Sequence, residues 1–180
     1  MDGNKKFSDN GSPLDYSLNE FWEWYASDLM HGPLRGALAE YIIAQALNID
    51  CSSGRNLWAA YDLEYQGHSI EVKSSAYLQK KEHLHLTKRL TFSIDTHKHG
   101  AETKHHAELY IFCLIHCKDE AVCNPMDLSQ WTFYILPTAE IEKLLGNKRT
   151  MSFRTLVSLN PTIASYKSLK QGIDEVCKNL

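Results

Sequence analysis

The chain has 180 residues, of which 43% are hydrophobic and 23% are charged, close to the averages for soluble globular proteins. This composition excludes disordered, collagen-like and coiled-coil proteins. A chain of this length can bury a sufficient hydrophobic core without disulfides or structural metal ions. Nineteen Lys and Arg against 22 Asp and Glu give a formal charge of −3, which excludes a uniformly basic surface but permits a local basic patch.

The sequence predicts a cytoplasmic location and no membrane partner. No segment approaches the roughly eighteen apolar residues of a membrane span. The stretch from Met1 to Lys6 lacks the apolar core of a signal peptide. The chain has an odd number of cysteines, and reduced thiols are their simplest interpretation.

Two helices are expected in the first part of the chain. Residues 1–16 are polar, and we expect a flexible N-terminus there, followed by a single domain over 17–180. Ser17 and Glu20 form a capping-box pattern that predicts a helix from 17 to about 29. Pro33 is suited to the first position of a second helix, ending near Leu47.

The hydrophobic period then changes from 3.6 to 2, which predicts a β-hairpin about a turn at Gln66-Gly67. The turn fixes a register that pairs Glu64 with Ser69, Leu63 with Ile70, Asp62 with Glu71 and Tyr61 with Val72. In this register one face of the hairpin is apolar and the other is polar.

Strands and helices continue to alternate toward the C-terminus. We expect strands over 86–94, 109–115 and 131–136, a helix over 138–145, and helical spacing from Thr162 onward. The uninterrupted apolar run over 109–115 is typical of a strand buried on both faces. The chain is therefore expected to be an α/β protein with a central mixed β-sheet flanked by helices.

The polar face of the hairpin carries the strongest chemical signal. Asp62 and Glu71 are predicted to face each other with Cβ atoms about 5 Å apart, and Lys73 points to the same side. Such an acidic pair is destabilising unless a proton or a cation lies between the carboxylates, and oxygen ligands suit Mg²⁺. The simpler interpretation is a solvated face on which Lys73 offsets the acidic pair.

Glu40 adds a further carboxylate on the second helix. Its helical neighbours Gly36, Ala37, Ile43 and Ala44 are small or apolar, which favours an inward orientation. The alternative places Glu40 at the edge of the apolar stripe, paired with a surface cation.

This pattern resembles the restriction-endonuclease-like PD-(D/E)XK nuclease superfamily. The resemblance covers residues 33–116: a helix with Arg35-Gly36 and Glu40, Tyr61-Asp62 on one strand, and Glu71-Val72-Lys73 on the next. Ala60-Tyr61 stand where the family often has Pro before the Asp, and between 116 and 137 a long loop leading into a strand stands where the family has a helix.

The resemblance implies a restriction-endonuclease-like core and a metal-dependent nuclease acting on DNA. Asp62, Glu71 and the main-chain carbonyl of Val72 would hold Mg²⁺ (or Mn²⁺), and Lys73 would orient the attacking water. Glu40 would reach the site from the helix, through water or as ligand to a second ion. Cutting both strands usually needs two active sites, so a homodimer is compatible with this activity.

Other clusters are weaker. Cys113, His116, Cys117 and Cys123 lack the spacing of a zinc site, so free thiols are expected. The segment 80–106 has six basic and three acidic residues, a charge of 6 − 3 = +3, and could hold a phosphate backbone, although a solvated hairpin explains it equally well. Residues that could line the substrate groove are Tyr77, Gln79, Lys80 and Lys81.

The sequence thus predicts an Mg²⁺-dependent phosphodiesterase, endonuclease-like, acting on DNA. The alternative is a protein with a nuclease fold that binds nucleic acid or a protein partner without cleaving it. A mixed surface charge is compatible with both, whereas the complete set of Asp62, Glu71 and Lys73 favours the enzyme.

Overall fold

The computed structural model describes residues 2–80, 84–87, 89–94, 97–99, 102–104, 107–145 and 148–180. The strands are β1 (Lys6–Asp9), β2 (Ser12–Ser17), β3 (Leu63–Tyr65), β4 (His68–Ala76), β5 (Leu78–Lys80), β6 (Leu84–Leu86), β7 (Thr91–Ser93), β8 (His97–His99), β9 (Glu102–Lys104), β10 (Leu109–Ile115), β11 (Trp131–Pro137), β12 (Thr150–Ser152) and β13 (Thr162–Ala164). The α-helices are α1 (Leu18–Tyr25), α2 (Gly32–Leu47), α3 (Thr138–Leu145), α4 (Phe153–Ser158) and α5 (Leu169–Cys177).

A five-stranded mixed sheet, in the order β13-β11-β10-β4-β3, forms the centre of the molecule. β3 pairs with β4 in antiparallel fashion, and β4 runs parallel to β10. β11 is antiparallel to both β10 and β13. The predicted α/β class and the central mixed sheet packed against helices are confirmed.

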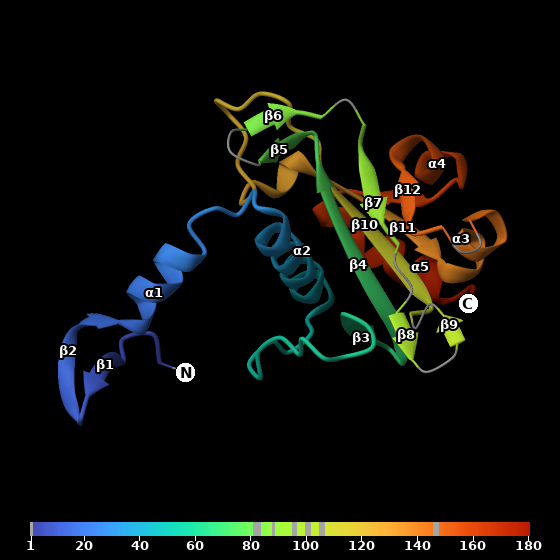
Figure 1. Cartoon of the computed structure of the whole chain (residues 1–180). Helices are drawn as coiled ribbons and strands as arrows, with labels where there is room; N and C mark the ends of the chain where they lie inside the picture. Colours follow the sequence, from blue (N-terminus) through green and yellow to red (C-terminus); the bar gives the residue numbers. More distant parts are fainter. Residues whose placement is uncertain are drawn as a thin grey trace.

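Helices cover the two faces of this sheet (Figure 1). α2 and α5 pack on one face, where Ile43 and Ile173 join Ile70 and Ile111 in a continuous apolar core. Elements α3, α4, β7 and β12 contribute to a second core on the other face. All seven residues of β10 are buried, because this strand has neighbours on both edges and both faces.

Several predicted elements are confirmed with small shifts at their ends. The second helix, the strands over 109–115 and 131–136 and the helix over 138–145 correspond to α2, β10, β11 and α3. The hairpin turn is also confirmed: Gln66 has φ 52° and Gly67 has φ 84°. Two successive residues with positive φ define the tight turn that matches the twist of the flanking strands.

The N-terminal segment differs from the prediction. β1 and β2 pair within residues 1–17, on either side of Asn10 (φ 47°) and Gly11 (φ 85°). Asn-Gly is a strong hairpin signal that the polar composition of this segment obscured. α1 follows with the predicted capping box at Ser17 but ends at Tyr25, not near 29. This arm projects away from the sheet (Figure 1).

The C-terminal region also differs. The helix expected from Thr162 begins only at Leu169, because residues 162–164 extend the sheet by pairing with β11. Two short strands, β6 and β7, stand where one strand over 86–94 was expected. β12 and α4 were not predicted, since three strand residues and six helical residues are too short to show a hydrophobic period. In the described part of the chain, no helix is both long and apolar enough to cross a membrane.

Candidate functional site

Asp62 lies just before β3, at the point where the β3–β4 ladder stops. The ladder contains only the pairs from Leu63–Ile70 to Tyr65–His68. The predicted pairing of Asp62 with Glu71 and of Tyr61 with Val72 is therefore wrong. One carboxylate oxygen of Asp62 instead accepts a hydrogen bond of 2.7 Å from the main-chain N–H of Val72. The carboxylate takes the position that a strand carbonyl would occupy, and this ends the ladder.

Glu71 and Lys73 form an ion pair on β4. Lys73 Nζ donates to Glu71 Oε1 at 2.5 Å, and both side chains are largely buried, with 21% and 8% of their surfaces exposed. Side chains alternate along a strand, and Ile70 and Val72 face α2, so Glu71 and Lys73 point to the opposite face of the sheet. The expected solvated face is therefore absent around this described pair.

Glu40 is buried on α2, as one of the two sequence interpretations expected, and it also has a cationic partner. Both carboxylate oxygens of Glu40 accept hydrogen bonds from the guanidinium of Arg55, in the connection between α2 and β3. The two expectations for Glu40 are thus both realised: the residue faces inward, and its partner Arg55 is half-exposed at the rim.

Electrostatic coupling connects these carboxylates. Burial raises the pKa of Glu40 above its ordinary value, and the hydrogen bonds from Arg55 oppose this rise. The negative charges of Asp62 and Glu71 raise the pKa of Glu40 further. Glu40 lies on α2, Asp62 directly precedes β3, and Glu71 lies on β4.

A cavity of about 450 Å³ opens beside these residues. Glu40, Arg55 and Asp62 line it together with apolar side chains such as Tyr41 and Leu63. Glu71 and Lys73 are not among its described lining residues. The structure therefore brings Glu40 and Asp62 to one cavity and places the Glu71–Lys73 pair behind it, on the other face of β4.

The residues present have the oxygen donors that Mg²⁺ prefers. The N–H and C=O of a strand residue point to the same side, so the Val72 carbonyl is directed toward Asp62 together with its N–H. Within the described ranges, however, no three His, Cys, Asp or Glu side chains form a group that could hold a metal ion. Arg55 on Glu40 and Lys73 on Glu71 supply the positive charge at this edge.

The four residues predicted to line a substrate groove have different positions. Tyr77 packs against the second core, and Lys118 Nζ lies 4.5 Å from the centre of its ring. Gln79 lines a separate cavity and donates to the main-chain oxygen of Ala76. Lys80 ends β5, and Lys81 lies outside the described residues, as does part of the basic segment 80–106.

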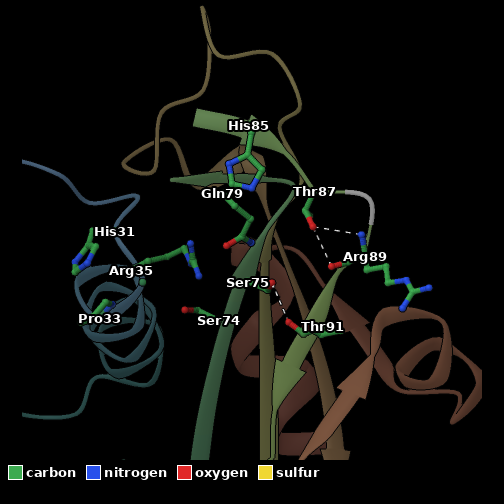
Figure 2. Close-up of a pocket in the computed structure, with 11 residues that line it drawn as sticks. His31, Pro33, Arg35, Ser74, Ser75, Gln79, His85, Thr87, Arg89 and Thr91 are labelled. Atoms are coloured by element: carbon green, nitrogen blue, oxygen red, sulfur yellow. Dashed lines mark hydrogen bonds between the residues drawn. The ribbon is translucent and has the colours of Figure 1, made fainter. Parts of the chain in front are cut away.

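A second cavity, of about 570 Å³, lies between the N-terminus of α2 and the end of β4 (Figure 2). It contains Arg35, which sequence reasoning placed only within the helix of the resemblance. The residue Arg35 is 7% exposed, and its Nε has no hydrogen-bond partner in the described structure. Arg55 was missed entirely, because a single Arg in a polar connection carries no periodic signal.

The cysteines are free thiols, as expected. Burial raises the pKa of Cys123 to about 11, with a further contribution from the neighbouring Cys117. Burial also raises the pKa of Cys113, which lies in the centre of β10. Cys113 is fully buried in the core and packs there as an apolar group.

The fold and the site define a mixed α/β protein with a cluster of acidic and basic side chains at one edge of its sheet. Comparisons with models of protein families, with curated proteins and with solved structures found no match. We therefore infer function from the residues of this chain.

Proposed function

We propose that this protein is a metal-dependent phosphodiesterase, endonuclease-like, that acts on DNA. The observation that supports the proposal is that Glu40 and Asp62 line one cavity, with the largely buried Glu71–Lys73 ion pair on the neighbouring strand β4. Two of these carboxylates are buried, and a buried charge lowers the stability of the fold unless a partner group offsets it. The PD-(D/E)XK pattern gives this cluster a chemical role.

The residues divide the work of cleavage between them. In hydrolysis, a water oxygen forms a bond to phosphorus, the bond to the leaving oxygen breaks, and the leaving oxygen receives a proton. Lys73 would stabilise the negative charge that develops on the phosphoryl oxygens. The hydrogen bond from the Val72 N–H would hold the Asp62 carboxylate in a fixed position when the substrate binds.

Mg²⁺ or Mn²⁺ would be held by Asp62, Glu71 and the Val72 carbonyl, with Glu40 as an additional carboxylate. A bound divalent cation polarises the phosphate and lowers the pKa of its water. Because Glu40 is paired with Arg55, a cation that uses Glu40 as a ligand must displace this guanidinium.

The alternative function is a nuclease fold that binds nucleic acid or a protein partner without cleavage. The ion pairs favour this alternative, since Arg55 and Lys73 already neutralise two of the three acids. In such a protein these paired acidic and basic side chains would only stabilise the fold.

A cleavage assay on Lys73→Gln distinguishes the two functions. Supercoiled and single-stranded DNA are incubated with the protein and Mg²⁺, with EDTA as the blank. Gln keeps a hydrogen-bond donor for Glu71 but removes the charge, so cleavage should fall on the order of 10² or more. The matched control is Lys143→Gln, whose partner Glu140 is in an exposed pair, and its cleavage should equal that of the wild type.

Thermal melting of each variant establishes that it is folded at the assay temperature. Equal cleavage by wild type and Lys73→Gln would contradict the proposed role of Lys73 and indicate a contaminant or another site. No cleavage by any of the proteins, with DNA binding retained, would establish the non-catalytic alternative.

A further inference from the structure

The cavity between α2 and the end of β4 is separate from the one that Glu40 and Asp62 line (Figure 2). Its lining includes Arg35, Ser74, Gln79, His31, His85 and Arg89. None of its described lining residues is acidic. The described lining thus collects basic side chains and hydrogen-bond donors, and it contributes no carboxylate.

The most unusual side chain of this cavity is that of Arg35, which is buried and only partly hydrogen-bonded. Its side chain is more than nine-tenths buried, and Figure 2 shows its guanidinium pointing from α2 toward Ser74 and Gln79. One nitrogen, Nη1, donates to the main-chain oxygen of Met30 at 3.0 Å, whereas Nε has no partner among the described residues. A buried guanidinium normally has a carboxylate or another full set of acceptors, because an unpaired buried charge is costly.

Burial also lowers the pKa of Arg35 below its ordinary value. The charged form is therefore destabilised by the protein alone, and an anion in the cavity would reverse this effect.

The start of α2 adds donors on the same side. The helix has 16 residues, and its N-cap, His31, makes no side-chain cap bond to the first turn. Apart from Pro33, which has no N–H, the N–H groups of this first turn lack intrahelical partners, and the helix dipole favours negative charge there. His31, Gly32 and Pro33 all line the cavity, so this end of the helix lies at its wall.

The open edge of β4 supplies a further donor. β3 covers β4 only as far as Ile70, so residues 71–76 have no β3 residue opposite them. The N–H of Val72 points to this edge, where it meets Asp62, and strand alternation directs the N–H of Ser74 to the same edge. Ser74 contributes both a hydroxyl and a main-chain donor to the region that Arg35 faces.

We propose that this cavity binds a phosphate group of a nucleic-acid strand, with Arg35 as its principal ligand. A tetrahedral anion with several oxygens fits a guanidinium, a helix N-terminus, hydroxyls and an amide that approach from different elements. Arg89 lies at the rim, and Figure 2 shows its guanidinium turned away from Arg35, so its contribution is smaller.

The size of the cavity indicates that the phosphate belongs to a larger molecule. About 570 Å³ is within the range of sites that hold drug-sized ligands, well beyond a single ion. The cavity includes Ser74, the residue after Lys73 on β4, and the two side chains point to opposite faces of the sheet. This nucleic-acid source rests on the proposed function, whereas the phosphate site itself does not.

The site is tested first with inorganic phosphate and pyrophosphate, in EDTA, by thermal melting and calorimetric titration. Either anion should raise the melting temperature of the wild type by roughly 5–10 °C at a hundredfold excess over its Kd. Arg35→Gln should weaken binding about tenfold or more, because a charge-assisted bond is lost. Arg154→Gln, on exposed α4, is the matched control and should bind as the wild type does.

Ser74→Asp is a second variant that keeps Arg35, so it tests the site even where Arg35→Gln does not fold. The new carboxylate would give Arg35 a partner, so the protein should melt at a higher temperature without phosphate and should no longer respond to it. An equal response of all four proteins, or no response of the wild type, would overturn the proposal.

Oligonucleotides with and without a 5′-phosphate then identify the source, again in EDTA so that cleavage plays no part. If Arg35→Gln weakens binding only of the phosphorylated strand, the cavity holds a terminal phosphate; if it weakens both equally, it holds an internal one. Phosphate binding without binding of either oligonucleotide would overturn the nucleic-acid source, and the Mg²⁺ cleavage assay on Lys73→Gln would decide the proposed nuclease separately. Loss of cleavage in Lys73→Gln with phosphate binding retained would separate the two sites.

Discussion

The carboxylate of Asp62 accepts a hydrogen bond from the main-chain N–H of Val72 at 2.7 Å, directly beyond the last pair of the β3–β4 ladder. This contact gives Asp62 a structural role that is independent of any chemistry. It ends the edge strand, and the rest of β4 is left with an open edge beside Arg35. A test of the acidic cluster must therefore separate loss of charge from loss of the hydrogen bond.

Asp62→Asn and Asp62→Ala form the pair that makes this separation. Asn can retain an acceptor for the Val72 N–H, whereas Ala leaves a partly buried donor without one. We expect Ala to lower the free energy of unfolding by about 1.5–3 kcal/mol, and Asn by about 1 kcal/mol or less. Urea unfolding at pH 7 measures both. Equal losses in the two variants would mean that the carboxylate charge, and not the hydrogen bond, stabilises this edge.

The hairpin illustrates what the sequence could and could not predict. Alternation and the Gln66-Gly67 turn were sufficient to place β3 and β4, and an uninterrupted apolar run was sufficient to place β10, because periodicity and burial act along the whole strand. The prediction that Asp62 and Glu71 face each other was wrong, because the side chain of Asp62 accepts the hydrogen bond of the Val72 N–H and interrupts the regular ladder there. Such a local hydrogen bond has no periodic signature.

The same reasoning applies to the cations of the site. Glu40 stood out because it was charged among apolar helical neighbours, but its partner Arg55 comes from an irregular connection. Arg35 appeared unremarkable on the first turn of α2, and only tertiary packing buries it. Contacts between a helix and a distant loop depend on chain geometry that composition does not encode.

The pH dependence of stability tests the environment of Glu40. Because burial raises its pKa in the folded protein, the folded state retains its proton to a higher pH than the unfolded state. Its stabilising contribution is complete below the ordinary Glu pKa of about 4.3 and is lost as pH rises through the raised value. We expect the free energy of unfolding of the wild type to fall over this range relative to Glu40→Gln, which has no such proton.

The measurement is urea unfolding of both proteins at intervals from pH 4 to pH 8, followed by subtraction of one curve from the other. Subtraction removes the titration of all other groups that the two proteins share. A constant difference across this range would mean that the pKa of Glu40 is the same in the folded and unfolded states, and that the Arg55 contact fully offsets burial.

The last prediction concerns competition between Arg55 and a divalent cation. Arg55 occupies both oxygens of Glu40, so a cation that uses Glu40 must first break these bonds. In Arg55→Gln, the acids at this edge lose one neutralising charge and repel one another more strongly. We expect the variant to melt at a lower temperature than the wild type without metal, and to gain more from Mg²⁺ or Mn²⁺. Its affinity for the cation should rise on the order of tenfold, the equivalent of one charge-assisted hydrogen bond at the lower end of its range.

Melting curves at increasing MgCl₂ measure both effects, because an ion that binds only the folded state raises the melting temperature. Arg55→Gln combined with Asp62→Asn is the control, and its gain should be lost if Asp62 is a ligand. An Mg²⁺ response that is the same in wild type and Arg55→Gln would exclude Glu40 as a ligand. A response that persists in the double variant would place the cation away from this edge of the sheet.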